Sequence, residues 1–129
     1  MIDFKHFIKK TFRPRGQRSF ISSIPKANCK ILDIGCGTNS IFLKSVKPNS
    51  SIYGVDVGSF QQTDESKALY DKLIICESED FAQSIQNINE DFDITISNHN
   101  IEHCEDPKGT FSAMVDKTKV GGSLFFATP

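Results

Sequence analysis

The sequence has no apolar run long enough to span a membrane, and no pair of cysteines at the close spacing of a metal site. It also lacks internal repeats, low-complexity tracts and the apolar stretch of a secretory signal. Its cysteines stand far apart, which disfavours a zinc ribbon and a disulfide framework: they are Cys29, Cys36, Cys76 and Cys104. We therefore expect one globular domain of the cytoplasm, with reduced thiols, in these 129 residues.

Charge is unevenly distributed along the chain, although the formal net charge is only −1. Residues 1–30 hold eight Lys and Arg residues against one acid, whereas residues 31–129 hold seven against fifteen. The basic segment has four candidate binding partners: the acidic remainder of the chain, a phosphate-bearing substrate, nucleic acid and anionic lipid. Of these four partners, we favour the first two. We expect a basic helical arm over residues 1–28 and a ligand-binding domain over residues 29–129.

The hydrophobic pattern alternates between strands and helices from residue 30 onward. Strands are predicted at residues 30–34, 51–57, 72–76, 92–97 and 123–127, and helices at residues 3–12, 41–46, 61–70, 80–88 and 107–119. Gly121 and Gly122 are expected to form the turn before the last strand. This alternation predicts an α/β fold with a doubly wound, mostly parallel sheet between two helical layers.

The most informative stretch is residues 30–40, where a short apolar strand runs into Gly-Cys-Gly. Glycines let a ligand approach the backbone at the carboxyl end of a parallel strand. Asp33 places negative charge beside this turn, which favours a ligand with an amine or a sulfonium over a pyrophosphate. Asp56 ends the second strand with two acceptor oxygens that suit a ribose diol. A nicotinamide enzyme is the main alternative, but it would favour glycine in place of Ser40.

Four segments carry a family resemblance in register. They read Ile-Leu-Asp-Ile-Gly-Cys-Gly, Tyr-Gly-Val-Asp-Val, Phe-Asp-Ile-Thr-Ile-Ser-Asn-His-Asn-Ile-Glu-His-Cys-Glu-Asp-Pro and Val-Gly-Gly-Ser-Leu-Phe-Phe-Ala-Thr-Pro. In this order they resemble the class I S-adenosylmethionine-dependent methyltransferases, and within them the small-molecule branch of methyltransferase types 11 and 23. The resemblance covers residues 27–129 and implies the strand order 3-2-1-4-5. It also implies a truncated chain without the family's last two strands, which leaves the fifth strand as an edge suited to self-association.

The same resemblance implies S-adenosylmethionine as cofactor, S-adenosylhomocysteine as product and a small-molecule methyl acceptor, with O-, N- and C-methylation all open. No nucleic acid partner and no membrane span are expected. The residues expected to hold the cofactor are Asp33, Gly35, Cys36, Gly37, Asp56, Val57, Glu77, Ser78, Glu79 and Asn98. The glycine turn and Asn98 would frame the methionine part, Asp56 the ribose, and residues 77–79 the adenine edge.

His99 and His103 are the candidate catalytic residues, because a histidine can remove the proton of an acceptor hydroxyl at neutral pH. Their spacing of four residues also resembles half of a metal site, but no third ligand accompanies them and no metal is expected. Asn39 stands where the family commonly has a third glycine. It leaves open a second hypothesis, a non-catalytic domain that binds S-adenosylmethionine or S-adenosylhomocysteine.

Overall fold

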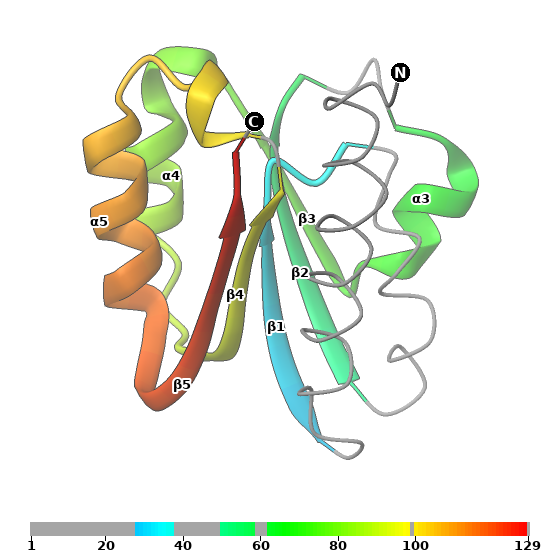
Figure 1. Ribbon diagram of the computed structural model, residues 1–129. Coiled ribbons are helices and arrows are strands. Elements are labelled where there is room, and N and C mark those ends of the chain that lie inside the picture. The colour runs from blue at the N-terminus through cyan, green and yellow to red at the C-terminus, as the bar shows by residue number, and fades with distance from the viewer. Residues whose placement is uncertain (1–27, 38–49, 59–61, 99, 129) are drawn as a thin grey trace, which may run out of the picture.

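The computed structural model describes residues 28–37, 50–58, 62–98 and 100–128. The expected basic arm, the helices predicted at 3–12 and 41–46, Asn39 and His99 lie outside these residues, apart from Asn28 at the end of the arm. The described residues form a five-stranded parallel sheet in the order β3-β2-β1-β4-β5 (Figure 1). The predicted fold class and strand order are therefore confirmed.

The strands and helices of the sheet follow the predicted order along the chain. The strands are β1 (Cys29–Ile34), β2 (Ser50–Val57), β3 (Lys72–Cys76), β4 (Phe92–Asn98) and β5 (Thr118–Ala127). The helices are α3 (Asp64–Leu69), α4 (Phe81–Gln86) and α5 (Pro107–Lys117), with 3-10 turns η3 (Ser78–Asp80) and η4 (Ile101–His103). The first four strands agree with the predicted bounds to within one residue. None of the described helices has the length and apolar character needed to cross a membrane.

The start of β5 corrects the sequence-based prediction. The strand begins at Thr118, directly after α5, and Gly121 and Gly122 lie within it rather than in a preceding turn. Between the pairs Phe92–Thr118 and Ile94–Ser123, β5 advances five residues while β4 advances two. Gly121 takes a φ of +82°, which a bulged strand accommodates at glycine. Sequence reasoning treats Gly-Gly as a turn signal and therefore misses a bulge.

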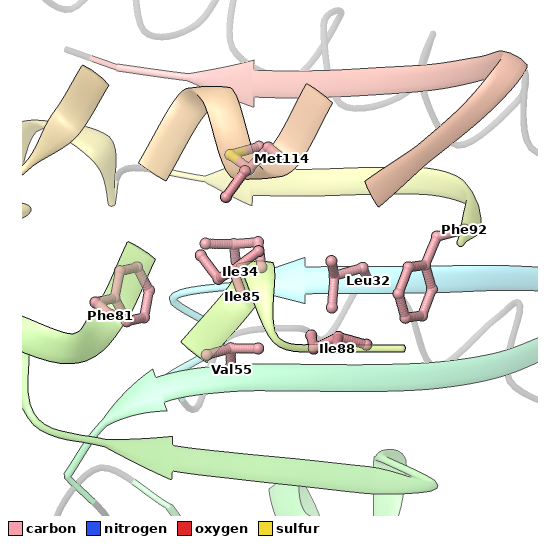
Figure 2. Close-up of a cluster of buried hydrophobic side chains, with 9 residues drawn as sticks. Leu32, Ile34, Val55, Phe81, Ile85, Ile88, Phe92 and Met114 are labelled. Carbon is pink, nitrogen blue, oxygen red and sulfur yellow. The ribbon is translucent and has the colours of Figure 1, made fainter. Parts of the chain in front are cut away.

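Alternation along the strands divides the core between the two faces of the sheet. Helices α4 and α5 cover one face and α3 lies against the other (Figure 1). Figure 2 shows the first face, where the packed residues are Leu32, Ile34, Val55, Phe81, Ile85, Ile88, Phe92, Ala113 and Met114. On β1, Ile31 belongs instead to the core cluster that contains Leu69 and Tyr70. Because strand side chains alternate, Asp33 also falls on the α3 face.

The α4/α5 face supplies a stability prediction from two neighbours on α5. Met114 is fully buried, whereas Val115 is 49% exposed. Replacing Met114 with alanine should lower the free energy of unfolding by about 2–5 kcal/mol, because the core loses a large side chain and keeps a cavity. The matched Val115→Ala variant should lower it by no more than about 0.5 kcal/mol. Urea unfolding followed by circular dichroism measures both, and equal losses would contradict this description of the core.

Candidate functional site

The turn after β1 is tied to β2 by its backbone. The Gly35 N–H donates a hydrogen bond of 2.7 Å to the Val55 carbonyl oxygen, and the Cys36 N–H donates one of 3.3 Å to the same oxygen. Gly35 has a φ of +69°, and a Cβ atom added there would lie 2.2 Å from Cγ of Asn100. Both the left-handed backbone and the close approach of Asn100 require glycine at this position.

Asp56 lies at the end of β2 and holds this turn through its carboxylate. Oδ2 accepts a hydrogen bond of 2.8 Å from the Gly37 N–H, and Oδ1 accepts one of 2.8 Å from the Val57 N–H. The Gln62 amide, just before α3, donates a longer bond of 3.3 Å to Oδ2. A carboxylate has about four acceptor positions, so Asp56 retains capacity for a ligand hydroxyl. Its orientation is fixed by backbone donors before any ligand binds.

Asp33 lies beneath the turn rather than on its surface. The residue is only 3% exposed, and its Oδ2 accepts a hydrogen bond of 2.8 Å from the Tyr70 hydroxyl. The neighbouring Cys36 thiol is buried as well. Burial, followed by the negative charges of Asp33 and Asp56, raises the pKa of Cys36 to about 12. Cys36 is therefore neutral at physiological pH and packs in the core cluster that contains Tyr70.

The end of β4 brings amide side chains to the same edge of the sheet. Ile34 pairs with Ser97, so Asn98 follows level with the glycine turn at Gly35. The Asn98 Oδ1 atom is buried and has no hydrogen-bond partner among the described residues. Asn100 lies directly over Gly35, and its Nδ2 donates to Cys104 Sγ at 3.5 Å. An unsatisfied buried acceptor beside a glycine turn is the feature that a ligand with a hydrogen-bond donor would complete.

The acids after β3 lie at the outer part of this edge. Glu77 and Glu79 are exposed, and the Ser78 hydroxyl donates to Glu105 Oε1 at 3.0 Å. That bond connects η3 to the segment before α5. The end of β3 is in turn linked to Asp56, because the Cys76 thiol lies 3.6 Å from the Asp56 carbonyl oxygen. These three residues are therefore close in the fold to the strand end that carries Asp56.

His103 lies at the end of η4, with an exposed ring whose Nε2 atom is 4.0 Å from Glu102 Oε1. Its backbone N–H donates to the Asn100 carbonyl oxygen at 2.9 Å, which closes the 3-10 turn. The described part of the chain contains no group of three or more His, Cys, Asp and Glu residues that could hold a metal ion. The four cysteines, all of them described, form no disulfide.

Sequence reasoning missed three residues that shape the site: Gln62, Tyr70 and Asn100. One signal for Tyr70 was available in the sequence, because a glycine inside a strand often marks a close approach of another group. Gly54 is that glycine. A Cβ atom there would lie 2.8 Å from Cδ1 of Tyr70 and 3.0 Å from Sγ of Cys36.

The parallel sheet, its glycine turn and the acid at the end of β2 define a doubly wound protein of the Rossmann-like class, with the site at the carboxyl ends of the strands. Over residues 4–129 the sequence matches the family described as "Methyltransferase domain". The chain belongs to this family, as the four sequence segments led us to expect.

Curated relatives and solved structures agree with this assignment. Ubiquinone biosynthesis O-methyltransferase of Bartonella tribocorum is 31% identical over 113 residues, which cover 86% of this chain and 45% of the relative. Biotin biosynthesis bifunctional protein BioHC of Saccharophagus degradans is 29% identical over 106 residues, which cover 81% of this chain and 19% of that protein. This chain thus spans less than half of either relative.

Two solved structures share the fold. The S-adenosylmethionine-dependent methyltransferase from Clostridium acetobutylicum aligns with a TM-score of 0.65 at 20% identity, covering 95% of this chain and 55% of that one. The second structure is magnesium protoporphyrin IX methyltransferase from Synechocystis, solved with bound S-adenosylhomocysteine. It aligns with a TM-score of 0.60 at 12% identity, covering 92% of this chain and 57% of that one.

Proposed function

We propose that this domain binds S-adenosylmethionine and supports transfer of its methyl group to a small-molecule acceptor, with S-adenosylhomocysteine as the product. The observation that carries the proposal is the hydrogen bond from the Gly37 N–H to Asp56, which joins the glycine turn of β1 to the acid at the end of β2. Family membership supports the same ligand, and the Synechocystis methyltransferase that shares the fold was solved with bound S-adenosylhomocysteine.

The residues of the site fit this cofactor. Asp56 would offer the vicinal hydroxyls of a ribose its one remaining acceptor position and the position that the long bond from Gln62 fills in this structure. The buried Asn98 Oδ1, which has no partner among the described residues, would accept a hydrogen bond from the methionine part. The turn from Gly35 to Gly37 would approach the same part through its backbone. Val57 and the segment 77–79 would border the adenine.

S-adenosylmethionine supplies an already activated methyl group on its sulfonium. The protein then has to align the donor with the acceptor and exclude water from them. The curated relatives named as ubiquinone O-methyltransferases favour a hydroxyl oxygen as the acceptor atom. Such an acceptor has to lose a proton, and His99 or His103 would take it. In this proposal residues 29–129 form the S-adenosylmethionine-binding domain and residues 1–28 a basic arm.

Isothermal titration calorimetry with the whole 129-residue chain tests the proposal. S-adenosylmethionine and S-adenosylhomocysteine should both bind. NADH should bind much more weakly, because the carboxyl group of Asp33 lies buried beneath the glycine turn, where a pyrophosphate would have to sit. If neither S-adenosylmethionine nor S-adenosylhomocysteine binds, the proposal is contradicted. Binding without methyl transfer to any hydroxyl, amine or carbon acceptor tested would favour the non-catalytic binding domain.

We also propose that copies of the chain associate through the β5 edge in a cytoplasmic setting. In the described residues β5 pairs with β4 on one side only, at the end of the sheet order. Val120 is fully exposed and Phe126 is half exposed on this strand. An unpaired edge with apolar side chains favours pairing with a second chain. Sedimentation equilibrium should give a dimer, and a monomer at all concentrations would contradict this proposal.

A further inference from the structure

Tyr70 reaches Asp33 from the far end of α3. It is the residue that ends this helix, and its backbone N–H donates to the Lys67 carbonyl oxygen. The side chain is 8% exposed and packs in the core cluster on the α3 face. From there its hydroxyl donates a hydrogen bond of 2.8 Å to Asp33 Oδ2, which is itself buried. A side chain 37 residues away in sequence thus contacts the acid of the glycine turn.

The surrounding structure holds Tyr70 in this place. Gly54, the neighbour of Asp33 in the β1–β2 ladder, leaves the space that the tyrosine ring fills, because a Cβ there would lie 2.8 Å from it. Asp71, the next residue, is hydrogen-bonded twice to Ile52 of β2. Its carboxylate accepts from the Ile52 N–H and its own N–H donates to the Ile52 carbonyl oxygen, both at 2.8 Å. The backbone is therefore held in place on both sides of Tyr70, by α3 before it and by the two Asp71–Ile52 hydrogen bonds after it.

A buried carboxylate keeps its charge only where hydrogen bonds replace the lost water. We propose that Tyr70 is a positioning residue: it holds the Asp33 carboxylate charged and oriented beneath the glycine turn, and thereby strengthens binding of the ammonium group in the amino-acid part of the cofactor. This inference rests on the proposed function. In the low-dielectric interior the charge of Asp33 acts on a nearby ammonium group more strongly than it would in water.

The test compares two ligands that differ in this part. S-adenosylhomocysteine carries the amino-acid group, whereas 5′-methylthioadenosine has the same nucleoside without it. Tyr70→Phe should weaken S-adenosylhomocysteine binding about tenfold and leave the dissociation constant of 5′-methylthioadenosine unchanged. Asp33→Asn should produce the same selective loss, and the double variant should lose no more than Asp33→Asn alone, because both changes act through one carboxylate.

The chain provides a matched control in its only other tyrosine. The Tyr53 hydroxyl also donates to a carboxylate, Glu90 Oε1, at 3.1 Å, but it belongs to the opposite face of the sheet. Tyr53→Phe therefore removes the same chemical group and should leave the affinities for both ligands unchanged. If Tyr70→Phe weakens both ligands equally, its role is only structural and the proposal is overturned. Unchanged S-adenosylhomocysteine binding would overturn it as well.

A spectroscopic measurement covers the case in which Tyr70→Phe does not fold. With tyrosine labelled at Cζ, the chain gives two resonances. The Tyr70 resonance should shift in Asp33→Asn and on addition of S-adenosylhomocysteine, while that of Tyr53 stays in place. A Tyr70 resonance insensitive to both changes would contradict the proposal. If the unaltered chain fails to bind S-adenosylhomocysteine at all, the proposed function fails rather than the Tyr70–Asp33 contact.

Discussion

Replacing Asp56 with alanine should weaken S-adenosylhomocysteine binding by more than tenfold, which corresponds to at least about 1.4 kcal/mol of binding free energy. The carboxylate is the acceptor that we assign to the ribose hydroxyls. It also receives the N–H groups of Gly37 and Val57, so its loss releases the turn that should border the cofactor. Two partly buried backbone donors then lack a protein acceptor, which should also lower the free energy of unfolding by about 1–3 kcal/mol.

Two variants separate these effects of Asp56. Asp56→Asn keeps one oxygen acceptor and should bind S-adenosylhomocysteine with intermediate affinity in calorimetry. Asp116 is an exposed acid on α5, so Asp116→Ala removes the same charge away from the carboxyl ends of the strands and should leave the affinity unchanged. A dissociation constant for Asp56→Ala equal to that of the unaltered chain would refute the ribose assignment.

Replacing Gly35 with alanine should abolish measurable S-adenosylhomocysteine binding and destabilise the fold. The left-handed φ of +69° costs a residue with a Cβ about 1–2 kcal/mol. The new Cβ would also collide with the Asn100 side chain at 2.2 Å. Relief of this contact requires the turn after β1 and the segment after β4 to separate, and these two segments carry the proposed methionine site. Urea unfolding and calorimetry measure the two losses.

Gly121 provides a control that isolates the free-energy cost of the left-handed backbone from the steric clash. It has a similar left-handed φ of +82°, but a Cβ there meets nothing within 4 Å in the described structure. Gly121→Ala should therefore cost about 1–2 kcal/mol of stability and leave binding unchanged. The double variant Gly35→Ala with Asn100→Gly removes the Asn100 side chain that would collide with the new Cβ. It should recover part of the affinity for S-adenosylhomocysteine. Equal behaviour of Gly35→Ala and Gly121→Ala would contradict the steric argument.

Much of the fold follows from local sequence patterns. The first four strands were predicted to within one residue because β-branched runs bounded by turn residues are a local signal. The start of β5 was missed because the same Gly-Gly pair serves a turn or a bulge, and only the register against β4 decides between them. The helices are shorter than predicted, since their ends depend on caps such as the Thr63 hydroxyl and the Tyr70 backbone.

The candidate site likewise has features that were predicted from the sequence and features that only the structure shows. Asp33, Gly35 and Asp56 were predicted from sequence as cofactor-binding residues, because each stands at or near the end of a predicted strand, and their roles stay a prediction. The hydrogen bond from Gln62 to Asp56 and the contact of Asn100 with Gly35 were not, because they join segments that only the folded chain brings together. Asp33 was also predicted from sequence to help hold the cofactor, but its burial beneath the turn and its hydrogen bond from Tyr70 became visible only in the fold.

The sequence by itself determined the α/β class, the strand order implied by the family resemblance, and the glycine turn with its two acids. These features are encoded over a few consecutive residues, in periodicity and in the spacing of Gly and Asp. Only the tertiary structure decided which donors hold those acids and where each carboxylate points. That decision depends on α3 packing over Gly54 so that a tyrosine 37 residues away reaches Asp33, a contact that no local pattern specifies.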